Sequence, residues 1–379
     1  MLAGCAYDLG AMALPDYPSN LSHEAPEGSS KCDQVHALAN DWVNRGMFEN
    51  EKGRLVEALV CFDEAIRLRL ELPFQHHPWF RWGLTAGWMN RAEVLVRMEK
   101  QAEALKSWDE ALHHLMLLPL EMEPAFRWRL GLAWMNRGLS LQALGRWDEA
   151  MVDLDLAAGT LQHSSMKEVR DRGTLGCVWL NRARLLLEMD RLDEARRDAE
   201  LALECLGPLE VTNSAAALSA LHVRHVWAQA VAQLLERGTS DMHQADAWIH
   251  AATDLVEESL TRVQAWRSQG VSLGELPAQL FHFGCRIYLA YQPHFLGEFM
   301  MDVLRPDASR TVHEALEDVA EEVLQTAALV LRKRGLADLG LTRADDLLVM
   351  LEKLAEAGRV IRSWRQERLG ETQTVRISG

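Results

Sequence analysis

Paired amphipathic segments with the same order of apolar and polar positions fill most of the first half of the chain. Each pair opens with a helical pattern that carries a tryptophan, breaks at a short polar turn, and resumes with a second amphipathic stretch. The pentapeptide around the tryptophan has the form Trp-x-Asn-Arg-Gly/Ala, and its copies lie 46, 46 and 45 residues apart. Such a period is typical of stacked helical hairpins rather than of one closed globule. The four tryptophans are Trp42, Trp88, Trp134 and Trp179.

Small residues recur in register with these tryptophans. One alanine follows each tryptophan by 16 residues and another follows it by 23 residues. Small side chains at these places let two helices approach closely enough to pack ridge into groove. The predicted turns between paired helices are Gly53-Arg54, Glu99-Lys100, Gly145-Arg146 and Asp190-Arg191. The alanines are Ala58, Ala104, Ala150 and Ala195 in the first set, and Ala65, Ala111, Ala157 and Ala202 in the second.

The order of tryptophan, glycine or alanine, alanine, bulky residue and alanine resembles the tetratricopeptide repeat (TPR) pattern over about 35–206. The bulky residue is Phe62, Trp108 and Leu154, whereas the fourth copy has Ala199, which predicts looser packing there. The resemblance implies an all-α, right-handed superhelical solenoid of TPR-like helical hairpins, closed by a helical C-terminal cap.

The repeat period is longer than the usual tetratricopeptide period of about 34 residues. Pro73 and Pro119 share one repeat position and are expected to end the second helix of a pair. Pro78 and Pro124 share another, and proline is favoured in the first turn of a helix. The first helices are therefore predicted to run from Pro78 to about Met98 and from Pro124 to about Leu144. This lengthening resembles the long-helix branch of the family, which includes kinesin light chain and the Pins-type adaptors.

The repeat pattern fades beyond the fourth copy. We expect a flexible N-terminal arm at 1–34, four repeats at 35–207, a degenerate fifth repeat at 208–270, and a helical C-terminal cap or effector region at 271–379. A solenoid needs an atypical terminal element to cover its last apolar face, which favours the cap. The helical segments expected in the last region are Thr311–Lys333 and Arg343–Arg365.

An asparagine stands at the same place in each first helix. Helix interiors disfavour asparagine because its side chain competes for local backbone hydrogen bonds. The resemblance implies that first helices line a concave groove, where such amides hold the main chain of an extended peptide. The alternative is a structural ladder in which each asparagine bonds the neighbouring repeat. The residues are Asn44, Asn90, Asn136 and Asn181.

An arginine follows each asparagine, and an acidic residue recurs at a fixed offset in the second helix. Matched opposite charges predict ion pairs between helices, with a structural role. The alternative is that the arginines bind carboxylates of a partner. The arginines are Arg45, Arg91, Arg137 and Arg182, and the acidic residues are Asp63, Asp109, Asp155 and Glu200. We also assign the four motif tryptophans to the structural core.

Aromatic and methionine residues share a second stripe of the first helices. Trp82 and Met89 lie seven residues apart, as do Trp128 and Met135. They are interpreted as a wall that receives apolar side chains of a peptide. The alternative is that longer helices need longer packing seams. The charges on the groove stripe are mixed, which predicts a ligand of mixed or modest charge. They are Glu93, Arg97, Arg184 and Glu188.

Composition narrows the classes of partner. The net charge is −15 over 379 residues, which disfavours nucleic acid and anionic membranes as partners. The 6 cysteines are scattered without a Cys-x-x-Cys motif, as expected for reduced thiols in a cytoplasmic protein. No phosphate loop, nucleophile elbow or metal-ligand motif is present, so we expect no enzyme, cofactor or metal site.

The sequence therefore predicts a non-enzymatic adaptor that binds an extended peptide segment of a protein partner in the concave groove. Two other functions remain open, a peptide-responsive regulatory receptor and a self-assembling structural scaffold. A homo-oligomer is compatible with both, since one end of a solenoid can pair with another.

Overall fold

The computed structural model describes residues 29–121, 123–162, 169–238, 243, 245–252, 254, 276–291, 296–303 and 351–363. Within these ranges all regular secondary structure is helical. The chain divides into two compact units, Met1–Leu185 and Leu186–Gly379. The all-α class is confirmed for the described residues. Most of the predicted N-terminal arm and the segment Thr311–Lys333 lie outside them.

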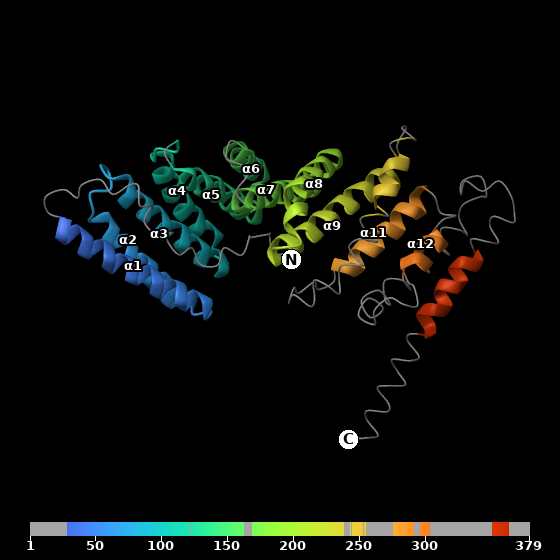
Figure 1. The fold of residues 1–379 in the computed structure, drawn as a ribbon, viewed down its shortest axis with the longest axis horizontal. Coiled ribbons are helices and arrows are strands. Elements are labelled where there is room, and N and C mark those ends of the chain that lie inside the picture. Colours follow the sequence, from blue (N-terminus) through green and yellow to red (C-terminus); the bar gives the residue numbers. More distant parts are fainter. Residues whose placement is uncertain are drawn as a thin grey trace, which may run out of the picture. The chain divides into compact units, whose positions relative to one another are not determined.

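The described part of the first unit consists of three helical hairpins and most of a seventh helix (Figure 1). Within it α1 packs on α2, α3 on α4 and α5 on α6, and each hairpin contacts the next through α2 and α3 and through α4 and α5. The helices are α1 Ser29–Glu51, α2 Leu55–Leu70, α3 Pro78–Arg97, α4 Gln101–Met116, α5 Pro124–Ala143, α6 Trp147–Gln162 and α7 Val169–Glu188. Helix α1 begins before residue 35, so residues 29–34 of the predicted arm are helical.

Prolines begin two of the first helices as predicted, and residues with left-handed backbone follow the ends of the first helices. Helices α2 and α4 end at Leu70 and Met116, three residues before Pro73 and Pro119. Pro78 and Pro124 are the first residues of α3 and α5, where the missing N–H costs no helical hydrogen bond. Each hairpin turn has a residue with positive φ, followed by an N–H that donates to a carbonyl five residues earlier, as from Lys100 to Leu95 at 2.8 Å. This is the Schellman end of a helix. The φ values are 73° at Gly53, 61° at Glu99, 74° at Gly145 and 62° at Asp190.

The repeated alanines lie in the buried core of the helix pairs. All eight have no exposed surface. The positions of the bulky residue are also buried, at 1% exposure for Phe62 and 3% for Trp108. A Cβ on Gly46 would stand 2.7 Å from the Phe62 ring, so the glycine of the first pentapeptide is needed for this contact. The small-residue pattern therefore identified the helix-packing seams correctly.

The second unit continues with helices of less regular sequence. Here α8 packs on α9, and α9 packs on α11. Trp227 Nε1 donates to Glu200 at 3.1 Å, and Trp227 occupies the repeat position that arginine holds in earlier copies. This contact fits a degenerate fifth repeat. The elements are α8 Leu192–Leu206, η1 Gly207–Leu209, α9 Ser214–Arg237, α11 Leu276–Tyr291 and α12 Leu296–Val303, and residues 351–363 are also helical.

Candidate interaction surfaces

Arginines of the pentapeptides bind acidic residues of the preceding repeat. Arg91 Nε lies 2.6 Å from Asp63, Arg137 Nε lies 3.1 Å from Asp109, and Arg182 Nε lies 2.8 Å from Asp155. The predicted ion pairs are confirmed for these three arginines, and each pair ties a first helix to the second helix before it. Arg45 belongs to the first copy, and its guanidinium lies 5.5 Å from the centre of the Trp42 ring.

The motif tryptophans lie beneath these ion pairs. In each copy the arginine sits over the ring of the tryptophan three residues earlier, as Arg91 does at 5.9 Å from the Trp88 centroid. All four tryptophans are partly buried. Trp42 packs against the buried cluster that includes Phe62 and Ala65. None of the four tryptophans is fully buried, so the prediction that they are core residues overstates their burial.

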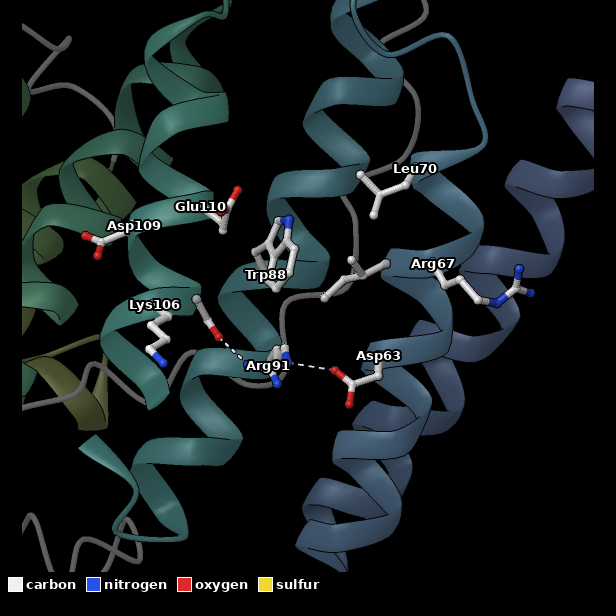
Figure 2. Close-up of a pocket in the computed structure, with 10 residues that line it drawn as sticks. Asp63, Arg67, Leu70, Trp88, Arg91, Lys106, Asp109 and Glu110 are labelled. Atoms are coloured by element: carbon white, nitrogen blue, oxygen red, sulfur yellow. Dashed lines mark hydrogen bonds and ion pairs between the residues drawn. The ribbon is translucent and has the colours of Figure 1, made fainter. Parts of the chain in front are cut away.

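A pocket opens above Trp88 between the second helices of two successive hairpins (Figure 2). Its volume is about 600 Å³. Apolar surface comes from Trp88, Ile66 and Leu70, and the Arg91–Asp63 pair lies at one side (Figure 2). The indole Nε1 of Trp88 is buried and has no hydrogen-bond partner. The other lining residues are Arg67, Lys106, Ser107, Asp109 and Glu110, so the rim carries both signs of charge.

The polar residue beside the pentapeptide arginine differs between the second and third repeats. Arg91 Nη1 donates to the Ser107 hydroxyl at 2.6 Å. The equivalent of Ser107 is Asp153, whose Oδ2 lies 3.5 Å from Arg137 Nε. Burial raises the pKa of the Asp153 carboxyl to about 6, and Arg137 opposes this rise. The arginine row therefore meets a neutral hydroxyl in one repeat and a buried carboxyl in the next.

The asparagines differ in exposure along the row. Asn44 is exposed and Asn136 is partly buried, whereas Asn90 and Asn181 are 4% and 1% exposed. The Nδ2 of Asn90 is buried and has no hydrogen-bond partner. Asn90 follows Trp88 by two residues, so the two side chains leave α3 about 200° apart. The asparagine row and the tryptophan pocket thus occupy different faces of the first helices.

The predicted aromatic and methionine wall is wrong as an open surface. Exposure is 1% for Trp82, 1% for Met89, 7% for Trp128 and 0% for Met135. Trp82 lies 5.0 Å from Phe126 between ring centroids, and Trp128 Nε1 donates to the Thr174 hydroxyl at 2.9 Å. The longer first helices use these side chains as packing seams, which is the alternative interpretation of the sequence.

The charged residues of the groove stripe are also placed. Glu93 and Arg184 are partly buried, and Arg97 is exposed. Arg97 Nη1 donates to the backbone carbonyl of Asn50 at 2.8 Å and to the Asn50 side-chain oxygen. Arg97 therefore ties α3 to the end of α1.

Two buried arginines were not predicted from the sequence to be candidate site residues. Arg69 has no exposed surface and Arg129 is 1% exposed. A signal was available, because the equivalents of Arg69 in later repeats are all leucine. They are Leu115, Leu161 and Leu206.

Other site chemistry is limited in the described residues. Those residues contain no group of three or more His, Cys, Asp or Glu side chains arranged to hold a metal ion. Their cysteines Cys32, Cys61, Cys177, Cys205 and Cys285 are free thiols. No helix in the described part of the chain is both long and apolar enough to span a membrane.

Comparisons with known proteins find similar folds among solved structures. No protein-family model and no curated protein matches the sequence. Among solved structures, BtubC (BKLC) from P. vanneervenii is 15% identical, with a TM-score of 0.45 over 74% of this chain and 91% of that chain. A tetratricopeptide repeat protein from Parabacteroides merdae is 16% identical, with a TM-score of 0.39 over 86% and 99%. At this level of similarity the comparison says nothing about ligands. The repeated hairpins, with their buried alanines and cross-repeat ion pairs, are tetratricopeptide-like.

Proposed function

We propose that this chain is a non-enzymatic adaptor that binds an extended peptide segment of a protein partner along its asparagine row. The amides of the asparagine row would contact the peptide main chain, since an amide can donate to a carbonyl and accept from an N–H. The row consists of Asn44, Asn90, Asn136 and Asn181. The partner would be a protein or peptide, in keeping with the acidic net charge of −15.

The observation that carries the proposal is the unpaired amide of Asn90. Its Nδ2 is buried and meets no acceptor, although a buried donor without a partner costs about 1–3 kcal/mol. A structural ladder would satisfy this donor within the protein, and at Asn90 it is not satisfied. A peptide carbonyl would remove this cost if the Asn90 side chain turns toward the groove on binding, since Asn90 is only 4% exposed without a ligand.

The pocket above Trp88 offers a competing surface, and the test must separate the two. A random peptide library selected against the full chain would supply a ligand, whose Kd is then measured by fluorescence anisotropy. We expect Asn90→Ala and Asn136→Ala to weaken binding by about 5- to 30-fold each, since a lost hydrogen bond is worth about 1–2 kcal/mol. Matched variants on the pocket rim, Lys106→Gln and Glu110→Gln, should leave the Kd unchanged.

Circular dichroism and thermal unfolding would show that each variant is folded. If the rim variants weaken binding and the asparagine variants do not, the tryptophan pocket is the binding site and the asparagine proposal is overturned. The receptor and scaffold alternatives depend chiefly on residues 271–379, most of which lie outside the described ranges.

A further inference from the structure

Arg69 occupies a place where the other repeats bury leucine. Leu115, Leu161 and Leu206 stand at the same repeat position and have no exposed surface. Arg69 is equally buried, so a charged group replaces an apolar one in the core of the first hairpin. A leucine would fill this place in the same way as in the other repeats. The arginine is therefore not explained by the needs of repeat packing.

The surroundings of Arg69 accommodate its guanidinium. Nη1 donates to the Gly83 carbonyl and Nη2 donates to Asn40 Oδ1 at 2.8 Å, while Nε has no partner. A Cβ on Gly83 would stand 3.3 Å from Nε, and a Cβ on Gly87 would stand 3.6 Å from Nη1. Gly83 thus leaves room for this side chain, whereas at Gly87 the close contact is with Ile66.

A second buried guanidinium reaches the same turn of α3. Arg129 extends from α5 and lies 3.7 Å above the centre of the Trp82 ring, the residue next to Gly83. Its Nε and Nη1 have no hydrogen-bond partner. Arg129 is also a departure from the repeat, since its equivalents are Gly83 and Thr174. The two exceptional arginines therefore converge on adjacent residues of one helix.

The charges that act on Arg129 are positive. Burial, together with the nearby cations Arg69 and Arg170, lowers its pKa to about 9. Burial lowers the pKa of Arg69 to about 10. Arg170 has a carboxylate of its own, with its Nε 3.3 Å from Asp171. Buried charges are normally paired, so two guanidiniums with unpaired nitrogens form a site that lacks an anion.

We propose that Arg69 and Arg129 form a carboxylate-binding site at the Trp82–Gly83 turn of α3, which opens to take an acidic side chain or chain terminus of the bound peptide, since neither guanidinium is more than 1% exposed in the closed form. The identity of the ligand as a peptide rests on the proposed function, whereas the anion site itself does not. Arginine pairs well with carboxylates because its planar fork matches their two oxygens. The Trp82 ring would hold the Arg129 guanidinium in place from its other face.

The repeats supply their own control residues. Arg69→Leu and Arg129→Thr introduce the residues that later repeats carry at these positions. Thermal unfolding of the full chain would be followed with sodium acetate as the probe, against sodium chloride at equal ionic strength. We expect acetate to raise the Tm of the wild type in a saturable way and each variant to lose this rise. Without acetate the variants should be at least as stable as the wild type, because an unpaired buried charge has been removed.

A direct measurement keeps the test independent of the variants. In protein labelled with ¹⁵N-arginine, the Nε resonances of Arg69 and Arg129 should shift when acetate is added. The proposal is overturned if these resonances do not move, or if the wild type shows no rise in Tm specific to acetate. A larger rise with inorganic phosphate would also overturn the assignment to a carboxylate.

The source of the carboxylate is tested with two further probes. N-acetyl-aspartate N-methylamide should act at a lower concentration than acetate, and its asparagine analogue should have no effect. Equal potency of acetate would overturn the peptide assignment. A second variant of the full chain would have four N-terminal carboxylates changed to amides, at Asp8, Asp16, Glu24 and Glu27. Its acetate response should equal that of the wild type. A stronger response would instead assign the carboxylate to the chain's own N-terminal residues.

This outcome can be separated from failure of the proposed function. Asn90→Ala should keep the acetate response in full. If the selected peptide is lost on Asn90→Ala but the acetate response is absent from the wild type, the adaptor proposal stands and the carboxylate site falls. The reverse pattern leaves the anion site without a peptide.

Discussion

The buried carboxyl of Asp153 makes a specific prediction for stability against pH. Asp153 is 3% exposed, and its Oδ2 has no hydrogen-bond partner. Arg137 Nε lies 3.5 Å from this oxygen. Burial raises the pKa of this carboxyl from 3.8 to about 6. The folded protein therefore binds a proton that the unfolded chain has already released between about pH 4 and pH 6.

The sign follows from proton linkage. When the folded state binds more protons than the unfolded state, the free energy of unfolding falls as pH rises. The penalty from Asp153 is absent below the unfolded pKa and fully present above the folded pKa of about 6. A shift of about two units corresponds to about 3 kcal/mol, since one unit is about 1.4 kcal/mol. Asp153→Asn removes this titration and should therefore gain on the wild type as pH rises.

Urea unfolding of wild type and Asp153→Asn across pH 4 to 8 would measure the difference. We expect the variant to gain up to about 3 kcal/mol relative to wild type over this range. Glu149→Gln in the same helix is a control of opposite sign. The Arg146 hydrogen bond lowers the pKa of Glu149, so its stabilisation is present at neutral pH and is lost as pH falls. A difference between wild type and Asp153→Asn that stays constant with pH would refute the reasoning.

Three further substitutions test the backbone and packing. Gly46→Ala should lower stability by about 1–3 kcal/mol, because its Cβ would stand 2.7 Å from the Phe62 ring, and a urea midpoint at lower concentration would show it. Gly159→Ala, in helix α6 with open space around its Cβ, should instead raise stability by about 0.5–1 kcal/mol, and a loss would contradict the open site. Glu99→Gly should raise stability by about 0.5–1 kcal/mol and so raise the Tm, because Glu99 has φ 61°, which glycine adopts without strain. An unchanged Tm would count against that conformation.

The internal repeat explains which features were predictable from sequence. Four copies of one unit act as an alignment within a single chain, so a shared position has a shared structural reason. The proline helix starts at Pro78 and Pro124 followed from this and are confirmed. An interhelical ion pair of Arg91 also followed from it, although the sequence did not indicate that the partner, Asp63, belongs to the preceding repeat. Each depends on local chemistry or on a fixed offset between charges, which the sequence contains directly.

Burial depth was harder to predict for a physical reason. Helical periodicity shows that Trp82 and Met89 share a face, but it does not show how closely the neighbouring helices cover that face. In the structure both are 1% exposed, whereas Trp88 is only partly buried and lines a pocket. The motif tryptophans are therefore less buried, and Trp82 and Trp128 more buried, than predicted, because the covering of a helix face depends on tertiary packing.

Departures from the repeat are more informative about ligands than the repeated residues are. The stacking of repeats explains a residue that every copy keeps, such as the arginine that binds the preceding acidic side chain. Arg69 is needed by no such rule, since leucine fills its place in three other copies. Arg129, the other departure from the repeat, contacts the same turn of α3 as Arg69. Two coincident exceptions that both add buried positive charge weaken the core, and a bound anion is the simplest compensation for that loss.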